Sequence, residues 1–281
     1  MGRDLSGQDL HGQDLSGQDL SGSNLYSSNL RRANLSGANL SGASLGAANL
    51  YECNLSGADL TSASLSRGAN LTEADLRNAN LTKADLEGAN LYGAFLGEAN
   101  LTQARLYRAN LPDAHLMGVM LNSADLNEAN LQRAQLSKAV LINATLNGAN
   151  VAWAVLDGAD LSAAFLDGAN LHGANLEGAN LTGANLEGAN LSECNLSGAN
   201  LAGAELADSN LVRADLKGAS LTGAELWFAN LNQADLRDAN LAGASMKGAN
   251  LTDAMTSVDD EGQLERAYLI GATMPDGTIH D

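Results

Sequence analysis

Leucine recurs at every fifth position over most of this chain. The series runs over Leu5–Leu65 and, after one extra residue in the word LSRGANL, over Leu71–Leu251, with only Val151 and Met246 interrupting it. On an α-helix, five residues rotate the chain by a net ~140°, so these leucines would spiral around every side. On a flat strand, an odd spacing places successive leucines on opposite faces. The leucines converge only if the chain bends once per five-residue word, always in the same direction, and coils around an axis.

The other positions of the word agree with such a coil. The residue two before each leucine is small, almost always alanine, which suits a side chain that points inward close to the axis. Two residues after the leucine, glycine is commonest, as expected for the second central residue of a type II turn, where φ is positive. Words with a large residue at this place are therefore expected to turn differently. They carry Glu73, Lys83, Arg108 and Arg213.

Words such as ANLSG, ADLEG and ANLTG resemble the consensus of the pentapeptide-repeat family. The resemblance implies an all-β fold, a right-handed quadrilateral parallel β-helix (a solenoid) in which four pentapeptides make one coil. The 13 words before the extra residue and the 37 after it then make about 12–13 coils. At ~4.8 Å per coil, the expected rod is about 60 Å long.

The pattern predicts one repeat domain and a short end segment. The β-helix covers residues 1–251, with a one-residue phase break at 66–70, and residues 252–281 form an irregular segment, a last partial coil and a cap. The stretch TDAMTSVDDEGQ is expected to be a loop or a short helix. The tail YLIGATMPDGTIHD resembles the ends of cyanobacterial family members, and its Pro-Asp-Gly is expected to turn the chain away from further pairing. We expect Trp227 and Phe228 to pack against this tail in a structural role.

The first coil departs from the consensus at both its inward and its outward positions. Its inward small residue is replaced by Gln8, Gln13 and Gln18, and its outward residues include Asp9, Asp14 and Asp19. A glutamine side chain can fold over the inward leucines that the first coil leaves open to solvent, and a ring of acidic side chains repels the end of a second rod. We predict that these six residues are an N-terminal cap, with sequence drift at a frayed terminus as the alternative.

The outward position just before each leucine is Asn or Asp nearly everywhere, but it changes character between residues 95 and 165. Several apolar or aromatic residues stand there or nearby, and exposed apolar patches often mark contact surfaces. The alternative is structural filler, because β-branched and aromatic residues also favour strands. The candidate partner surface consists of Phe95, His115, Met120, Val140, Ile142, Trp153, Val155 and Phe165.

Acidic residues gather in the second half of the chain. The net charge is −18, and residues 161–281 hold 17 acids against 5 bases. A spacing of four words would stack pairs of acids one coil apart, as acidic stripes that are either functional or only solubilising. These pairs are Asp157 with Glu177, Asp167 with Glu187, Glu205 with Glu225, and Asp215 with Asp235. With this charge we expect no direct binding of nucleic acid through its phosphates.

No motif for chemistry stands out. The four histidines are scattered, no metal-ligand spacing occurs, and Cys53 and Cys194 are about seven coils apart, too far to form a disulfide. We therefore expect no enzyme, no cofactor, no metal, no membrane span and a cytoplasmic location. The chain is expected to be a monomer or an end-associated dimer.

Two functions remain open. The first is a non-catalytic protein-interaction scaffold, regulatory in a cyanobacterium, that acts on an unknown protein partner. The second is a DNA mimic, which similarity to the gyrase-binding members of the family implies as an inhibitor or protector of DNA gyrase. An acidic chain of −18 copies DNA poorly, because about 60 Å of duplex would carry about 35 charges.

Overall fold

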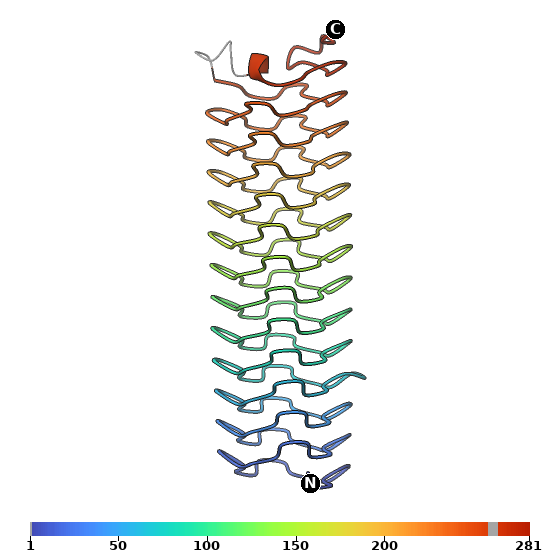
Figure 1. Ribbon diagram of the computed structural model, residues 1–281, viewed down its shortest axis with the longest axis vertical. Helices are drawn as coiled ribbons and strands as arrows, with labels where there is room; N and C mark the ends of the chain where they lie inside the picture. Colours follow the sequence, from blue (N-terminus) through green and yellow to red (C-terminus); the bar gives the residue numbers. More distant parts are fainter. Residues whose placement is uncertain (1, 258–263) are drawn as a thin grey trace. The chain divides into compact units, whose positions relative to one another are not determined.

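The structure, a computed structural model, describes residues 2–257 and 264–281. The chain forms two compact units, Met1–Thr145 and Leu146–Asp281, and in each of them coils of the chain stack on one another. In Figure 1 the first unit runs from blue to green and the second from yellow-green to red. Among the described residues, none lies in a helix with the length and apolar character needed to cross a membrane.

Within each unit, the residue before each leucine pairs in parallel with the equivalent residue four words further on. Asn90 bridges Asn110 and Phe95 bridges His115 in the first unit, and Asn170 bridges Asn190 in the second. Hydrogen bonds run from the backbone on both sides of such a residue. For example, the N–H of Asn110 donates to Ala89 of the coil before it, at 2.9 Å. Four words therefore make one coil of a parallel β-helix, as the family resemblance implies.

Between bridged residues, every regular word closes with a tight turn. The N–H of Ala179 donates to the carbonyl of Leu176 at 3.0 Å, and Gly178 between them has a φ of 61°. This is the type II geometry expected for glycine. The prediction that large residues would turn differently is wrong. Glu73, Lys83, Arg108 and Arg213 have φ values of 56°, 59°, 55° and 58°. Hydrogen bonds to the neighbouring coils hold the turn, so the backbone keeps its path although this conformation costs a non-glycine residue about 1–2 kcal/mol.

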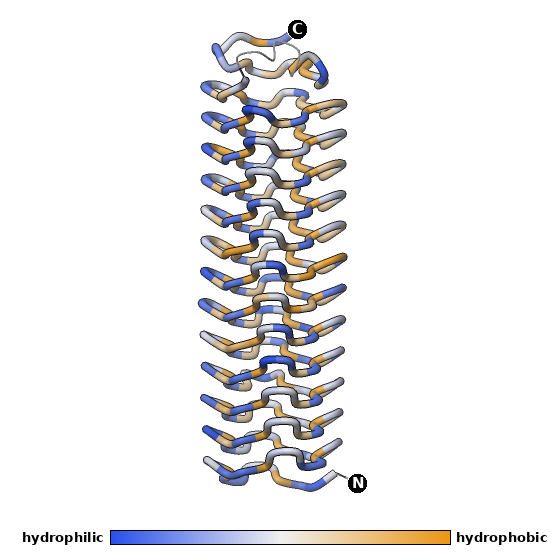
Figure 2. Tube along the Cα trace, turned by 90° about the vertical axis from the view of Figure 1, so that its left-hand side faces the viewer, coloured by the Kyte–Doolittle hydropathy of each residue, from blue (hydrophilic) through white to orange (hydrophobic). Residues whose placement is uncertain are grey.

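The core of each unit is a column of leucine and small side chains. The inward leucines from Leu20 onward in the first unit are at most 1% exposed, whereas Leu10 and Leu15 are 6% and 8% exposed. Figure 2 shows the same pattern along each coil, where apolar segments in orange alternate with polar ones in blue. Polar residues fit the small inward sites when they can bond to the backbone, as the Ser28 hydroxyl does by donating to Leu25 at 2.8 Å.

The extra residue of LSRGANL is absorbed within one turn. Bridges across the extra residue, such as the one between Ser64 and Asp85, join residues 21 positions apart in the sequence instead of the usual 20. From Asn70 onward, which bridges Asn90, the spacing is again 20. Arg67 and Gly68 both have positive φ, 60° and 77°, which makes this turn wider than its neighbours. It is the loop that extends to the right in the blue-green part of Figure 1.

The second unit ends in an irregular closing segment. Pairing of the repeat continues through Met255, which bridges Asp235. The prediction of a loop or short helix falls partly on residues 258–263, which lie outside the described residues. A 3-10 helix, η1, follows at Leu264–Arg266, and parallel pairing then resumes between Ser245 and Tyr268.

The chain reverses after this last partial coil. Ile279 pairs antiparallel with Thr273, and the N–H of Gly277 donates to the carbonyl of Met274 at 2.9 Å. The expectation that Pro-Asp-Gly turns the chain away from further pairing is therefore wrong. Gly277 has a φ of 85°, which lets the turn fold the last residues back onto the free side of the preceding segment.

Candidate interaction surfaces

The outward Asn and Asp residues have a structural task. Their Oδ1 atoms accept the backbone N–H two residues ahead, as Asn70 does from Thr72 at 3.2 Å. Many also bond along the stack, where the Nδ2 of Asn190 donates to the Oδ1 of Asn170 at 3.1 Å. Asn and Asp side chains of this kind accept hydrogen bonds from backbone N–H groups that do not pair in the short β-bridges.

In the first unit, part of the candidate surface lacks the Asn or Asp side chain that would accept the backbone N–H. Phe95 and Met120 stand at the outward position, where Phe95 has no acceptor atom and the thioether sulfur of Met120 is only a weak one. Phe95 stacks in parallel on His115, with ring centroids 4.8 Å apart and an angle of 3° between the rings. Met120 bridges Val140, as the four-word spacing predicts. Phe95, His115 and Met120 are exposed, whereas Val140 and Ile142 are half-buried.

Sequence reasoning missed Met117, which is among the most exposed large apolar residues of the first unit. It lies in the turn between His115 and Met120, so it joins the two columns of apolar residues around one corner of the coil. The residue that follows the leucine varies widely from word to word, so the pattern held no clear signal for Met117. We call the set Phe95, His115, Met117, Met120, Val140 and Ile142 the Phe95 surface.

The remaining candidates, Trp153, Val155 and Phe165, belong to the second unit. Trp153 and Phe165 are exposed and Val155 is half-buried. The Trp153 ring covers Gly173, where a Cβ atom would lie 2.3 Å from it. It also meets the ring of His172 edge-on at a centroid distance of 4.9 Å. Trp153 therefore packs mainly on the next coil.

The structure places the acidic pairs one coil apart, as their spacing predicts. Glu205 and Glu225 are bridged residues, and so are Asp215 and Asp235. The other two pairs follow the same arrangement through the backbone. The carbonyls of Glu177 and Glu187 accept from Gly158 and Gly168, the residues next to Asp157 and Asp167, both at 2.9 Å. Their role as acidic stripes remains a prediction.

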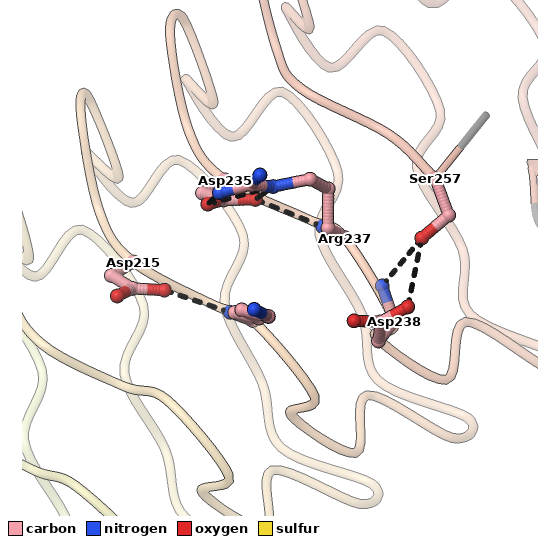
Figure 3. A network of polar contacts seen from close by, with 6 residues as sticks. Asp215, Asp235, Arg237, Asp238 and Ser257 are labelled. Carbon is pink, nitrogen blue, oxygen red and sulfur yellow. Dashed lines mark hydrogen bonds and ion pairs between the residues drawn. The ribbon is translucent and has the colours of Figure 1, made fainter.

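One of these pairs is partly neutralised by its own coil (Figure 3). Asp235 is 9% exposed, and the Arg237 Nε donates to its Oδ1 at 2.8 Å. These hydrogen bonds from Arg237 lower the pKa of Asp235. Below it, the backbone N–H of Lys217 donates to Asp215 at 3.0 Å. The Asp215–Asp235 pair thus presents less acidic surface than the bridged Glu205 and Glu225, which form no ion pair with any described residue.

The predicted N-terminal cap contains one direct contact across the first coil. Arg3 Nη1 donates to Gln18 Oε1 at 3.1 Å, while Gln8 and Gln13 are exposed. The acids of the cap have local bonds as well. Asp9, Asp14 and Asp19 accept the N–H two residues ahead and the Nδ2 atoms of Asn29, Asn34 and Asn39. Capping remains a prediction.

A hollow of about 340 Å³ lies beside the wide turn of the phase break. Its lining includes Arg67, Glu87 and Tyr107, and the Arg105 guanidinium donates to Glu87 at 2.7 Å. These side chains form no pair of a nucleophile and a base. Among residues 2–257 and 264–281, no group of three or more His, Cys, Asp and Glu residues could hold a metal ion.

Both cysteines are inward and buried. Burial raises the pKa of Cys53 and of Cys194 to about 12. Each thiol is close to a backbone carbonyl, with Cys194 Sγ 2.9 Å from the oxygen of Leu171. They occupy the small inward site of the repeat, where alanine is usual.

Comparison with protein families agrees with the period and the pairing. A family model described as pentapeptide repeats matches almost the whole repeat array. The chain belongs to the pentapeptide-repeat family. The matched segments are residues 4–37, 28–67, 67–97, 99–136, 134–173, 154–192, 169–208, 189–227, 199–238 and 219–254.

Similar solved structures belong to the same family. HetL from the cyanobacterium Nostoc sp., a pentapeptide repeat protein involved in the regulation of heterocyst differentiation, is 35% identical. The match covers 99% of this chain and 94% of HetL, with a TM-score of 0.38. A pentapeptide repeat protein from the cyanobacterium Cyanothece is 37% identical over 39% of this chain and 63% of its own, with a TM-score of 0.30. QnrB1, a plasmid-mediated fluoroquinolone resistance protein, is 20% identical over 81% of this chain and 92% of its own, with a TM-score of 0.35. A search of curated proteins gave no match.

Proposed function

We propose that this protein is a non-catalytic scaffold that binds a partner protein through the Phe95 surface. The observation that carries the proposal is the loss of the outward Asn or Asp at Phe95, His115 and Met120. The repeat uses that residue to satisfy a backbone N–H, as Asn70 does for Thr72.

Replacing the outward Asn or Asp with Phe, His or Met is unfavourable for the stability of the isolated chain. A side-chain hydrogen bond to the backbone contributes about 0.5–1.5 kcal/mol to stability. Phe95 and Met120 remain exposed, so burial offsets only part of that loss. Aromatic and methionine side chains gathered on a surface are typical of sites that contact another protein.

The setting of this scaffold is also a proposal. The four bridged positions in each coil support four-sided coils, and the family resemblance implies that they are right-handed. Two buried, unbridged cysteines support a reducing, cytoplasmic location. The resemblance of the C-terminal stretch to cyanobacterial family members supports a regulatory role in a cyanobacterium.

The test restores the consensus residue. Replacing Phe95, His115 and Met120 together with Asn should abolish capture of the partner from a cyanobacterial extract. The same change should raise the free energy of unfolding, because each Asn can again accept a backbone N–H. Capture is read by mass spectrometry against wild type, and stability by urea unfolding.

Gln135→Asn is the matched control, since Gln135 bridges His115 at the same outward position without adding an apolar side chain. It should leave capture unchanged. If the triple variant is less stable than wild type and still captures the same proteins, these side chains are structural filler and the proposal fails.

The DNA-mimic alternative makes the opposite prediction. Changing Glu177, Glu187, Glu205 and Glu225 to Gln would then weaken binding to DNA gyrase, in a strongly salt-dependent way, and the Asn variants would have no effect. Inhibition of gyrase supercoiling by the wild-type protein at stoichiometric concentration would favour this alternative over the scaffold.

A further inference from the structure

A second group of exposed apolar side chains lies on one face of the second unit, near its last coils. Trp227, Phe228, Tyr268 and Ile270 are 43%, 60%, 68% and 64% exposed. Backbone pairing places them together. Phe228 donates to the carbonyl of Lys247, and Gly248 donates to that of Ile270, so the group spans adjoining coils of one face. Tyr268 bridges Ser245 on the same face. We call these four residues the Trp227 surface.

Phe228 is held in an unfavourable conformation. Its φ is 57°, at a turn position that carries glycine in the coil above, at Gly248. A bulky residue there costs about 1–2 kcal/mol, and Phe228 recovers little of this because most of its surface stays in solvent. Its ring leans on Gly248, where a Cβ atom would come within 2.6 Å of it.

Trp227 is fixed beside it. Its indole Nε1 donates to the hydroxyl of Ser245 at 2.6 Å, which holds the ring against the next coil with one edge in solvent. A rigid aromatic side chain loses little conformational entropy when a partner covers it. Trp and Tyr are also the residue types that contribute most to binding at protein interfaces.

The charge of this face identifies the kind of partner. Glu205 and Glu225 are bridged directly below Ser245, and the backbone N–H of Asp208 donates to the carbonyl of Trp227. Lys247 and the exposed Arg266, two residues before Tyr268, add two positive charges beside these three acids, so the described side chains of this face keep a net negative charge. A second copy of the chain, with a net charge of −18, would place like charges against this face. A partner that is positively charged fits it.

We propose that the Trp227 surface docks a cationic segment of another protein that also presents apolar side chains. The apolar side chains of the segment pack on Trp227, Phe228, Tyr268 and Ile270, and its Lys or Arg residues pair with Glu205 and Glu225. This surface lies in the second unit, and its test does not depend on the Phe95 surface.

The probe is a synthetic amphipathic peptide of leucine and lysine, compared with a peptide of equal length in which every lysine is glutamate. Trp153→Phe leaves Trp227 as the only tryptophan, so its fluorescence reports on this surface alone. The cationic peptide should shift the emission of Trp227 to shorter wavelength in a saturable way. The glutamate peptide should give no shift.

Two variants separate specific docking from general attraction to an acidic protein. Glu205→Gln with Glu225→Gln should weaken binding of the cationic peptide by about tenfold. Asp157→Asn with Glu177→Gln removes the same charge from a different column and should change affinity by less than about twofold. Phe228→Gly should weaken binding and at the same time raise the melting temperature, because glycine relieves the unfavourable φ.

Equal loss of affinity in the two charge variants would overturn the proposal, since binding would then follow net charge alone. A blue shift of Trp227 that depends on protein concentration without peptide, with a dimer in sedimentation, would show a second copy as the occupant and also overturn it. Saturable binding that survives Phe228→Gly unchanged would do the same.

Discussion

At the scale of single residues, the fold imposes one conformation on the turn position whatever residue occupies it. Glycine, alanine, charged residues and even Trp153 and Phe228 all have φ near 60° there. The hydrogen bonds of the neighbouring coils thus override the local preference of the side chain. Each non-glycine residue at this position stores some strain, and replacing it should release that strain.

Ala163 offers a direct test, because its φ is 53° and it is exposed. Ala163→Gly should raise the free energy of unfolding by about 0.5–1 kcal/mol, the reverse of the usual effect of glycine. Its neighbour Ala164 points inward and is fully buried. Ala164→Gly should lower stability by about 1–2 kcal/mol, through lost burial and added chain entropy. Urea unfolding measures both, and a loss of stability in both variants would contradict the strain argument.

The buried cysteines predict a loss of stability in alkali. Their folded pKa of about 12 lies above the unfolded value of about 8.5, so folding favours the protonated thiol. The contribution is fully present below about pH 8.5 and is lost as the pH rises toward 12, by about 1.4 kcal/mol per pH unit for each thiol.

Cys53→Ala with Cys194→Ala, which restores the usual small residue, should flatten this dependence in urea unfolding between about pH 8 and about pH 10.5. Identical pH profiles for wild type and variant would mean that the thiols do not control alkaline stability.

At the scale of elements, the coil is defined by its four-word register. The phase break shows how one extra residue is tolerated, because Arg67 and Gly68 widen a turn and leave every inward leucine in place. Insertion at a turn is therefore mild, whereas a residue lost from a regular word moves the inward and outward positions out of phase.

Deleting Arg67 should be tolerated, because it converts LSRGANL into the regular word LSGANL. The melting temperature should stay within a few degrees of wild type or rise, since one residue with positive φ is removed. Deleting Lys138, another basic residue at a turn with a φ of 57°, leaves a word that is one residue short. This control should lose many degrees or fail to unfold cooperatively, and circular dichroism melts compare the two. An equal loss of melting temperature in both deletion variants would show that stability does not depend on keeping the five-residue register.

At the scale of the whole molecule, charge and exposed pairing edges decide how copies interact. A net charge of −18 is expected to keep copies apart, and we predict that Asp9, Asp14 and Asp19 of the first coil add to this repulsion. Leu10 and Leu15 of that coil are 6% and 8% exposed, more than the inward leucines of the later coils in this unit.

Removing the cap should therefore promote association. We expect oligomers in analytical ultracentrifugation when Gln8, Gln13 and Gln18 become Ala and Asp9, Asp14 and Asp19 become Asn. The Asn residues keep an oxygen for the backbone N–H, so the coil itself should remain folded. Neutralising Asp157, Glu177 and Glu187 removes the same charge elsewhere and should leave the protein in its wild-type state. An unchanged sedimentation profile for the cap variant would remove the capping argument.

The candidate surfaces were only partly predictable from the pattern. Phe95, His115 and Met120 are visible as departures from Asn or Asp at one place in the word. Met117 was missed because turn positions vary more widely. The stacking of Phe95 on His115 and the ion pair of Asp235 with Arg237 depend on side-chain directions, which a spacing rule does not contain.

The five-residue period by itself determined a coil with inward leucines, because each residue of the array contacts residues one coil away in a constant register. The resemblance of its words to the pentapeptide-repeat family implied the four words per coil. Only the tertiary structure decided the features beyond the regular array. Beyond residues 258–263 the register differs from that of the array. Ser245 pairs with Tyr268 and Asn250 with Thr273, each 23 positions further along the sequence instead of the regular 20. Counting by words could not bring Tyr268 and Ile270 to the face of Trp227 and Phe228, nor fold Ile279 back onto Thr273. Those contacts follow from where the irregular segment returns the chain to the stack.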